Sequence, residues 1–585
     1  MPSLTANDNT HTPSLKSTIL LSVEASPIIM PEFSFYPHLT ATGPPPFYRD
    51  VAALYRERFL ELVDAGTLRP MVLHYHLMGY AFLLAYLCFP HKNRPWLYNA
   101  RWAVLGLITW WNYTTLWETS SGGHATNMVV GVISSYGWAT ACTWLVLSKP
   151  QWDAKRVQRR MVPVDPSDKG IYINGHARDI SSQTNGHVAA EKSSALKGRT
   201  QVAITKGGDD TDLLAKVNGN GNISQVEEYF WESYPESFRG RFFWTSDLLI
   251  NFRGPGWNWA VPGLPAPPEA ISKQLSGLDM KSARSGISFT GLQRFDTRQE
   301  LFRYLYPRFV VGYFLIDFLK TIMMKDPYFI FGPTTYALPP FLQKLSPLGL
   351  WCYRAVLSGV TVIHALEMAF MLGPLLLCFI LGPKVIGQRG EAWYYPTVWG
   401  SFSNILDKGL NGLWGGYWHQ TFRLSFAAPT KFLIGNGYIE KRSTVTKILQ
   451  LFFAFGISGM IHYTGSVTQL ARTHHLHNPI FFMSQVPGIL IQSTACAILN
   501  PYIIKLPRSI RRAGNCLFVV VWLLATGPWL ADDFARGGVW LWEPVPISPF
   551  RGLGFGLEGD GWWCWDVFGW GWHHGKHWWD SGLAM

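Results

Sequence analysis

Hydrophobic residues in this chain are concentrated in long runs, and polar residues fill the stretches between them. A window of about 19 residues, close to the length that a membrane helix requires, selects eight candidate spans. They lie at residues 71–89, 102–118, 126–148, 304–324, 356–381, 448–468, 480–500 and 515–531. The pattern therefore predicts an all-α fold, a polytopic transmembrane helical bundle with about eight spans.

The polar stretches divide the chain into regions. Residues 166–225 contain too few apolar residues to build a core, so we expect a long disordered loop there. The expected regions are a poorly defined N-terminal region (1–70), three transmembrane helices (71–148), a basic low-complexity loop (149–226), an interfacial or amphipathic segment (227–303), a helical region (304–531) and a Trp/Gly/His-rich tail (532–585).

The distribution of Lys and Arg among the loops predicts the orientation. With eight spans, the basic loops 90–101, 149–303, 382–447 and 501–513 all fall on one side of the membrane. The opposite loops are poorer, since 119–125 has no Lys or Arg. Cytoplasmic loops are enriched in Lys and Arg, so we expect the basic side, including the disordered loop, to be cytoplasmic.

The composition agrees with a membrane protein. Only 15% of residues are charged, against about 25% in soluble domains. The 28 Trp residues suit the membrane interfaces, where Trp is enriched. The net charge of +12 does not indicate a nucleic-acid partner, because no Lys/Arg stripe lies on a folded polar domain. The seven Cys residues are scattered without a C-x-x-C pair, so neither a disulfide framework nor a zinc site is expected from them.

His462 is the first candidate for chemistry. It lies in the apolar stretch 448–471, which contains no Asp, Glu, Lys or Arg, and Ser458 precedes it by one helical turn. Ionisable groups inside a membrane are costly and usually functional. A neutral imidazole can take the proton of an alcohol that attacks a carbonyl. The alternative is a histidine that is hydrogen-bonded between helices and only holds them together.

His419 is the second candidate. It lies in the run Leu-Trp-Gly-Gly-Tyr-Trp-His-Gln-Thr-Phe-Arg, between the fifth and sixth spans. The polar and aromatic residues that we select as substrate-binding candidates are Trp414, Trp418, Gln420 and Arg423 of this run, together with Ser458. The alternative is that these aromatic residues anchor the segment at a membrane interface.

Other titratable residues have structural alternatives as well. His573, His574 and His577, with Asp580, form a dense cluster in the tail, which suggests either metal binding or a loosely ordered tail. His364 and Glu367 either line a tunnel or pair with each other. Asp317 and Lys320 have the spacing of an i,i+3 ion pair.

The quoted residues resemble the membrane-bound O-acyltransferases, and among them the wax-synthase-like branch of fungal secondary metabolism. That branch shows an aromatic-Trp-Gly-Arg-Arg-Trp-His-Gln-x-x-Arg segment, followed on a later apolar helix by Ser-Gly-x-x-His. This chain matches the first element at Trp414-Gly415, Trp418-His419-Gln420 and Arg423, and the second at Ser458-Gly459 and His462. The segments 251–259 and 326–329 also resemble this branch, so the resemblance covers residues 227–531. The chain departs from the pattern at Leu413 and at Gly416-Tyr417, which replaces the Arg-Arg pair.

The resemblance implies direct acyl transfer, with His462 as catalytic base and His419 as the second active-site residue. The co-substrate would be acetyl-CoA or another acyl-CoA, with no bound cofactor and no metal, and its phosphates would need other cations such as Arg423 or Lys431. The acceptor would be a lipophilic alcohol, such as a terpenoid or polyketide intermediate, that arrives from the bilayer. The expected location is the endoplasmic reticulum membrane.

Other functions are weighed against this interpretation. A long-chain wax ester synthase would use the same residues with a fatty alcohol. A di-iron desaturase would need several histidine boxes on the cytoplasmic side, whereas His474, His475 and His477 fall on the predicted luminal side. A non-enzymatic transporter-like protein would show paired repeats or broken helices in corresponding halves, and the sequence shows neither.

Overall fold

The computed structural model describes residues 44–163, 223–565 and 571–585, together with the short strand segments 172–173, 176–177, 203–204 and 215–217. Most of the segment 166–225, which the composition predicts to be disordered, lies outside the described residues.

The described chain is mostly helical, with few and short strands. A helix occupies each predicted span: α4 (Met78–Cys88), α6 (Arg101–Glu118), α7 (His124–Cys142), α12 (Arg298–Met323), α15 (Pro347–Pro374), α19 (Thr444–Val467), α20 (His477–Ile498) and α22 (Arg508–Arg536). Among the described residues, five helical segments are long and apolar enough to cross a membrane: 124–147, 347–390, 444–467, 477–498 and 508–536. The spans predicted at α4, α6 and α12 stay a prediction.

The first predicted span is shorter than the sequence pattern indicates. Arg69 and Pro70 form strand β1 (Arg69–Pro70), which pairs with β2 (Thr119–Ser120), and the amide of Met71 donates to the Ser120 carbonyl. The chain then forms a short helix, α3 (Leu73–His76), before α4 begins. The start of this apolar run is therefore held in an extended conformation, and α4 keeps only the second part of it.

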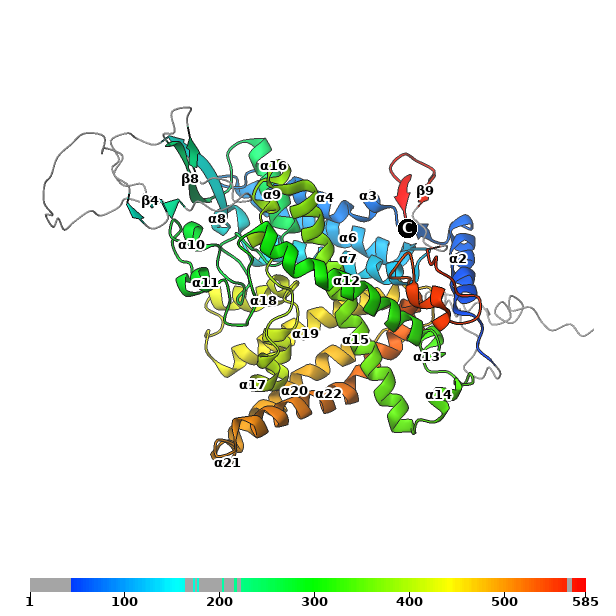
Figure 1. Cartoon of the computed structure of the whole chain (residues 1–585). Coiled ribbons are helices and arrows are strands. Elements are labelled where there is room, and N and C mark those ends of the chain that lie inside the picture. The colour runs from blue at the N-terminus through cyan, green and yellow to red at the C-terminus, as the bar shows by residue number, and fades with distance from the viewer. Residues whose placement is uncertain are drawn as a thin grey trace, which may run out of the picture.

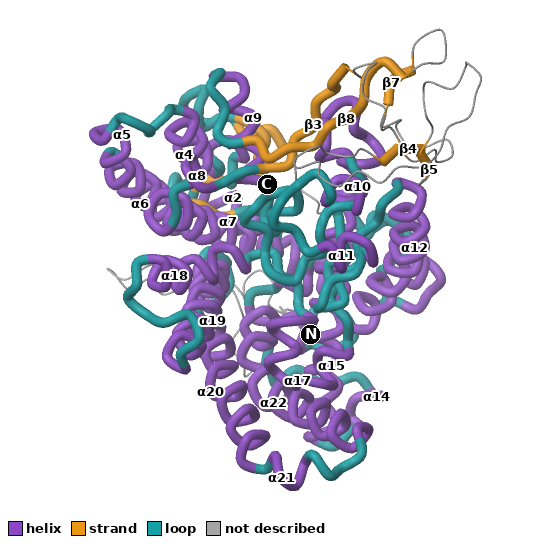
Figure 2. Tube along the Cα trace, turned by 90° about the vertical axis from the view of Figure 1, so that its left-hand side faces the viewer, coloured by secondary structure: helices purple, strands orange, loops and turns teal. Residues whose placement is uncertain are grey.

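Helix α19 contacts three other helices of the bundle. It packs against α7, α18 (Arg423–Gly435) and α20, while α20 packs against α22 and α22 against α17 (Ser403–Gly412) (Figures 1 and 2). The approach of α7 to α19 is close, because a Cβ atom on Gly131 would lie 2.0 Å from the Thr464 carbonyl oxygen. Small residues at helix contacts permit such approach inside membranes. The helix that carries His462 is thus enclosed on several sides.

Two strands lie in regions that the sequence pattern left without strands. β3 (Arg156–Pro163) pairs with β8 (Ile223–Glu232) in antiparallel register. Cross-strand ion pairs join Arg156 to Glu232 (2.6 Å) and Arg160 to Glu228 (2.7 Å). Opposite charges on paired strands stabilise a sheet, but their partners are far apart in the sequence. The all-α expectation therefore needs this correction, since no local pattern announces the pairing.

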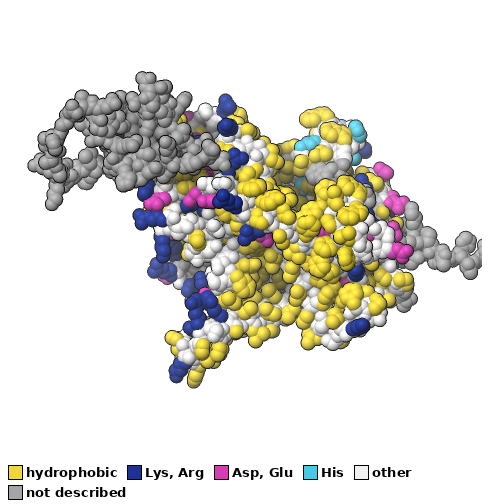
Figure 3. Space-filling model, viewed as in Figure 1, with side chains coloured by type: hydrophobic (Ala, Val, Ile, Leu, Met, Phe, Trp, Pro, Cys, Tyr) yellow, Lys and Arg dark blue, Asp and Glu magenta, His cyan; other side chains and the backbone are white. Residues whose placement is uncertain are grey.

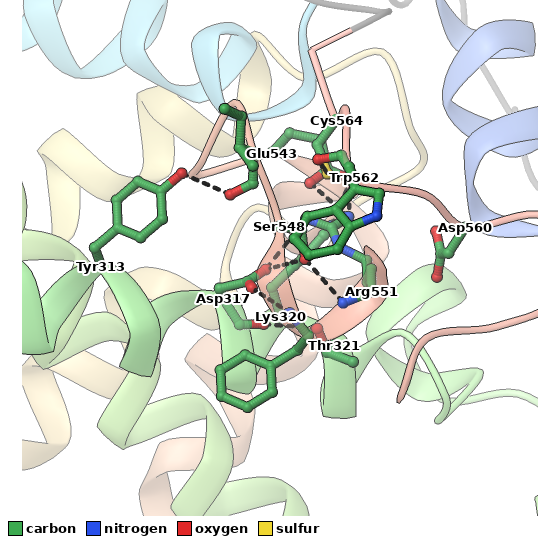
Figure 4. Close-up of polar contacts among 12 residues, drawn as sticks. Tyr313, Asp317, Lys320, Thr321, Glu543, Ser548, Arg551, Asp560, Trp562 and Cys564 are labelled. Atoms are coloured by element: carbon green, nitrogen blue, oxygen red, sulfur yellow. Dashed lines mark hydrogen bonds and ion pairs between the residues drawn. The ribbon is translucent and has the colours of Figure 1, made fainter. Parts of the chain in front are cut away.

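A buried group of charges attaches the C-terminal segment to the helices (Figure 4). Arg551 contacts Glu543 (2.8 Å) and Asp317 of α12 (3.6 Å), and it donates to the Tyr48 hydroxyl of α2 (Tyr48–Asp64) at 2.9 Å. Lys320 donates to the Trp540 carbonyl at 2.6 Å. The expected i,i+3 pair between Asp317 and Lys320 is therefore wrong, because both side chains pair with the C-terminal segment instead.

The surface view separates charged from apolar areas. Lys and Arg side chains gather at the edge where α17, α21 (Asn500–Ile503) and α18 lie, and hydrophobic side chains cover much of the middle (Figures 1 and 3). Such a division is the one expected of a helical bundle whose apolar middle is solvated by lipid and whose basic edge faces water. This arrangement agrees with an integral membrane protein.

We predict that Arg551→Met destabilises the protein strongly. The substitution leaves the buried carboxylates of Asp317 and Glu543 without their guanidinium, and breaking a buried ion pair costs about 3–5 kcal/mol. Thermal unfolding of the detergent-solubilised protein measures the effect. The control is Arg58→Met, which breaks the solvent-exposed pair with Glu61 and should cost about 1 kcal/mol or less. Equal effects of both substitutions would contradict the prediction.

Candidate active site

His419 lies in a sharply shaped segment between α17 and α18. A π-helical turn, η5 (Leu413–Tyr417), follows α17, and the Trp418 amide closes it on the Leu413 carbonyl at 2.7 Å. Trp418 is extended, so the chain leaves the helix one residue before His419. Single π-helical turns occur frequently at functional sites because they displace side chains from the ordinary helical face.

The glycines of this segment make room for its neighbours. A Cβ atom on Gly416 would lie 2.7 Å from the Asn404 side chain, and one on Gly400 would lie 1.9 Å from the Gly416 carbonyl oxygen. The Gly400 amide donates to the Tyr417 carbonyl at 2.9 Å. The loop that carries Trp399 can therefore lie directly against the turn that carries His419.

Aromatic rings surround His419. Its ring centroid lies 5.5 Å from Phe370 of α15, 6.0 Å from Trp399, 5.3 Å from Trp418 and 5.9 Å from Phe422. These rings come from three separate parts of the chain. They form an apolar setting for a polar side chain.

His462 lies on α19 between two further aromatic residues. Its ring stacks on Phe482 of α20 with centroids 4.7 Å apart, and Phe534 of α22 lies at 6.2 Å. In the part of the chain that the structure describes, no residue forms a hydrogen bond with the ring of His462 or of His419, and the Nδ1 atom of each is buried. The ring of His462 thus makes no hydrogen bond to a neighbouring helix among the described residues.

The surroundings of His419 keep its imidazole neutral. Burial, and to a smaller extent the charges of a protonated His462 and of Arg253, lower the pKa of His419 to about 3. His419 is therefore neutral near pH 7. Both rings lie deep in the protein, yet each residue keeps partial exposure.

The other selected residues of the first motif hold the segment itself. Gln420 donates to the Trp418 carbonyl at 2.6 Å and to the Trp414 carbonyl at 3.2 Å. Arg423 donates to the Gln420 side-chain oxygen at 2.6 Å and to the Gly415 carbonyl at 3.1 Å. Both side chains therefore fix the backbone around His419.

The last two selected residues lie on separate elements. Trp414 lies in the turn η5, and Ser458 lies on α19. The Trp414 indole donates to Gln485 of α20 at 3.2 Å, and its ring lies 5.7 Å from Phe455 of α19. Ser458 is half-buried one turn before His462. Trp414 thus joins the His419 segment to α19, which carries His462, and to α20.

Arg253 supports the site, although sequence reasoning did not select it. Its guanidinium donates to the carbonyls of Thr397 (2.8 Å) and Pro396 (2.7 Å), which precede Trp399. Phe252 beside it contacts Phe422, as does Tyr136 of α7 at 4.6 Å. The two glycines that follow Arg253 were the sequence signal, because Gly254 and Gly256 indicate a tight turn rather than an anchor at a surface. Their φ angles are positive, at 76° and 75°.

The remaining candidates lie apart from the two imidazoles or serve structure. His364 contacts the Gly312 carbonyl of α12 at 3.0 Å, and Glu367 lies one turn from Phe370 on α15. His573 lies in β9 (Gly571–His573), which pairs with β10 (Gly582–Ala584), and Asp580 caps the His577 amide at 2.7 Å. The described residues contain no group of three or more His, Cys, Asp or Glu that is arranged to hold a metal ion.

Comparisons with known proteins place the two histidines in one matched region. Residues 395–484 match the model of the membrane bound O-acyl transferase family, and this range includes both His419 and His462. No solved structure matches the chain.

Three curated fungal proteins are similar over about half of this chain. O-Mevalon transferase macI of Penicillium terrestre is 25% identical over 44% of this chain and 54% of its own length. O-Mevalon transferase yanI of Aspergillus niger is 24% identical over 54% of this chain and 64% of its own length. Acetyltransferase nanB of Aspergillus nanangensis is 22% identical over 49% of this chain and 66% of its own length. The alignments with the first two therefore cover less than two thirds of those relatives.

The matched region, the fungal relatives and the two motifs agree with one another. The segment around His419 and the helix of His462 are the parts that carry the family match, and five described helices suit a membrane. Residues 395–484 are therefore similar to the membrane bound O-acyl transferase family, and about half of the chain is similar to fungal proteins named O-mevalon transferases and acetyltransferases.

Proposed function

We propose that this protein transfers an acyl group from an acyl-CoA to the hydroxyl of a lipophilic alcohol. One observation carries the proposal: the buried Nδ1 atoms of His419 and His462 have no hydrogen-bond partner in the described chain, aromatic rings contact both imidazoles, and the charge of His462 acts on the pKa of His419. A buried polar atom without a partner is costly and calls for an explanation. A substrate that supplies the missing partner explains both atoms at once.

The chemistry follows from a neutral imidazole. His462 accepts the proton of the alcohol as its oxygen bonds to the thioester carbonyl carbon. The carbon–sulfur bond then breaks, CoA leaves with the proton that His462 returns, and the ester remains. His419 orients the alcohol or donates to the oxyanion that forms in between. The transfer needs neither a metal nor a covalent intermediate on the enzyme.

The surroundings support an apolar acceptor. Phe rings of α15, α20 and α22, together with Trp399, Trp418 and Phe422, contact the two histidines, and such rings favour flat or polycyclic apolar molecules. We therefore propose a terpenoid or polyketide alcohol of secondary metabolism as the acceptor. A location in the endoplasmic reticulum membrane would give such an alcohol access from the bilayer.

The donor that we propose is acetyl-CoA. Relatives named acetyltransferases support it, among them nanB and Acetyltransferase cdmC of Talaromyces verruculosus. Two relatives named O-Mevalon transferases make a mevalonyl donor the second candidate. A long-chain acyl donor for wax esters is the further alternative.

Two cations on α18 suit the phosphates of CoA. Burial lowers the pKa of Arg423 and, together with the charge of Arg423, that of Lys431. Neither side chain pairs with a carboxylate among the described residues. A polyanionic donor would give the partly buried Arg423 and the exposed Lys431 a negatively charged partner. These residues also take over the role that the missing Arg-Arg pair would have in the related motif.

We predict that His462→Ala lowers acyl transfer by about 10²–10⁴-fold, the usual contribution of a general base. Membranes that contain the wild type or the variant receive acetyl-CoA, mevalonyl-CoA or palmitoyl-CoA with terpenoid, polyketide and fatty alcohols, and CoA release is measured. The control is His91→Ala, at a buried histidine that contacts the Tyr86 carbonyl elsewhere in the bundle. CoA release that needs the alcohol but survives His462→Ala would contradict the assignment of the base.

We predict that Arg253→Lys lowers transfer about tenfold. A lysine cannot reproduce both hydrogen bonds that fix the backbone before Trp399, and hydrogen bonds to charged groups are worth about 1.5–3 kcal/mol. The same CoA-release assay measures the loss. The matched control is Arg239→Lys, an exposed arginine on α9 (Phe238–Ile250), which should leave the rate unchanged. Equal rates for both variants would refute the supporting role of Arg253.

A further inference from the structure

Three helices meet at the backbone of His462 through one side chain. The amide nitrogen Nδ2 of Asn478 on α20 donates to the His462 carbonyl at 3.2 Å and to Asp533 Oδ2 on α22 at 2.8 Å. The other oxygen of Asp533 accepts the His474 amide at 2.7 Å. One asparagine and one aspartate thus join α19, α20 and the loop before α20 to α22.

We propose that Asn478 and Asp533 are positioning residues that set the imidazole of His462 for proton transfer. The inference rests on the proposed acyltransferase function and extends it to residues outside both sequence motifs. Neither residue touches the reacting atoms. Both act through the place and orientation of His462.

The contact between Asn478 and Asp533 is buried, so it restricts how α20 and α22 can pack. Asn478 is 0% and Asp533 1% exposed. A carboxylate at such depth is tolerated when hydrogen bonds satisfy its oxygens, and here both oxygens have a donor. A displacement of α20 against α22 would leave this carboxylate unsatisfied, so the pair permits a narrow range of positions for the two helices.

The same two helices also hold the His462 ring. Phe482 lies one turn after Asn478 on α20 and stacks on the imidazole at 4.7 Å. Phe534 follows Asp533 on α22 and lies 6.2 Å from the ring. Each helix therefore contributes one polar contact that acts on the His462 backbone and one aromatic contact on its ring. A misplacement of about 1 Å in such a site costs on the order of 10²-fold in rate.

An exchange of the two side chains separates positioning from simple helix attachment. In the double variant Asn478→Asp/Asp533→Asn, the new asparagine can donate to the new aspartate and still accept the His474 amide. The attachment of α20 to α22 is therefore kept. The aspartate oxygen that replaces Nδ2 has no proton to donate to the His462 carbonyl, so that single contact becomes repulsive.

We expect the double variant to keep the wild-type thermal midpoint within a few degrees, and its kcat to fall at least tenfold with an unchanged KM for the acyl donor. The single variant Asn478→Asp places two carboxylates together and should lose both stability and kcat. If it does not accumulate in membranes, Asn478→Ala is measured in its place, with the same tenfold loss of kcat expected. Recovery of wild-type kcat by the exchange would overturn the proposal.

A second contact between the same helices provides the control. Gln492 of α20 donates to Asn515 of α22 at 3.1 Å, and Asn515 also donates to the Leu406 carbonyl. Asn515→Ala should lower the thermal midpoint without lowering kcat. A loss of kcat as large as that of the Asn478 variants would show that any loosening of α20 and α22 has the same effect, and it would overturn the proposal.

The outcome is distinguishable from a failure of the proposed function. If the wild type releases no CoA with any donor and acceptor, the acyltransferase function itself fails. If the wild type is active and His462→Ala is inactive, but the Asn478 variants match the wild type, then only the positioning role fails.

Discussion

The pairing of buried charges is the constraint on which the rest of this structure depends. The interior of a membrane bundle offers no water to solvate a carboxylate or a guanidinium, so each such group needs a partner in the protein. Asp317 and Arg551 satisfy one another between α12 and the C-terminal segment. Asp247 of α9 does the same with Arg156 and Arg389, and it also accepts the Trp257 indole. These contacts connect segments that are far apart in the chain.

Within this paired framework, the imidazoles of His419 and His462 differ from their surroundings. Aromatic rings enclose them, yet no side chain of the described chain satisfies their nitrogens. Polar side chains contact the backbone around the two rings instead. Gln420 and Arg423 hold the backbone of the His419 segment, and Asn478 donates to the His462 carbonyl. These contacts fix the backbone around the two rings, and in the proposed function a substrate supplies the partner that their Nδ1 atoms lack.

Two residues that depart from the related motif, Gly416 and Tyr417, are packed against neighbouring side chains. Where the family pattern has an Arg-Arg pair, this chain has Gly416 and Tyr417. Gly416 lies against Asn404 with no room for a Cβ atom, and the Tyr417 ring stacks on Trp399 at 5.8 Å. The position therefore serves the packing of the Trp399 loop against the His419 segment. Cations for a polyanionic donor remain available on α18.

The sequence by itself determined the helical class, the positions of the long helices and the two histidines. Hydrophobic length and a polar residue within an apolar run are local properties, so they are visible without the fold. Only the tertiary structure decided which residues meet. Separate segments contribute four residues to the site: Arg253, Phe370, Asn478 and Asp533. Strand β3 pairs with the distant strand β8, and ion pairs between oppositely charged side chains join the two. Asp317 and Lys320 have the spacing of a local pair, but burial against the C-terminal segment gave them other partners. Long-range contacts of this kind depend on how helices pack, which no local pattern records.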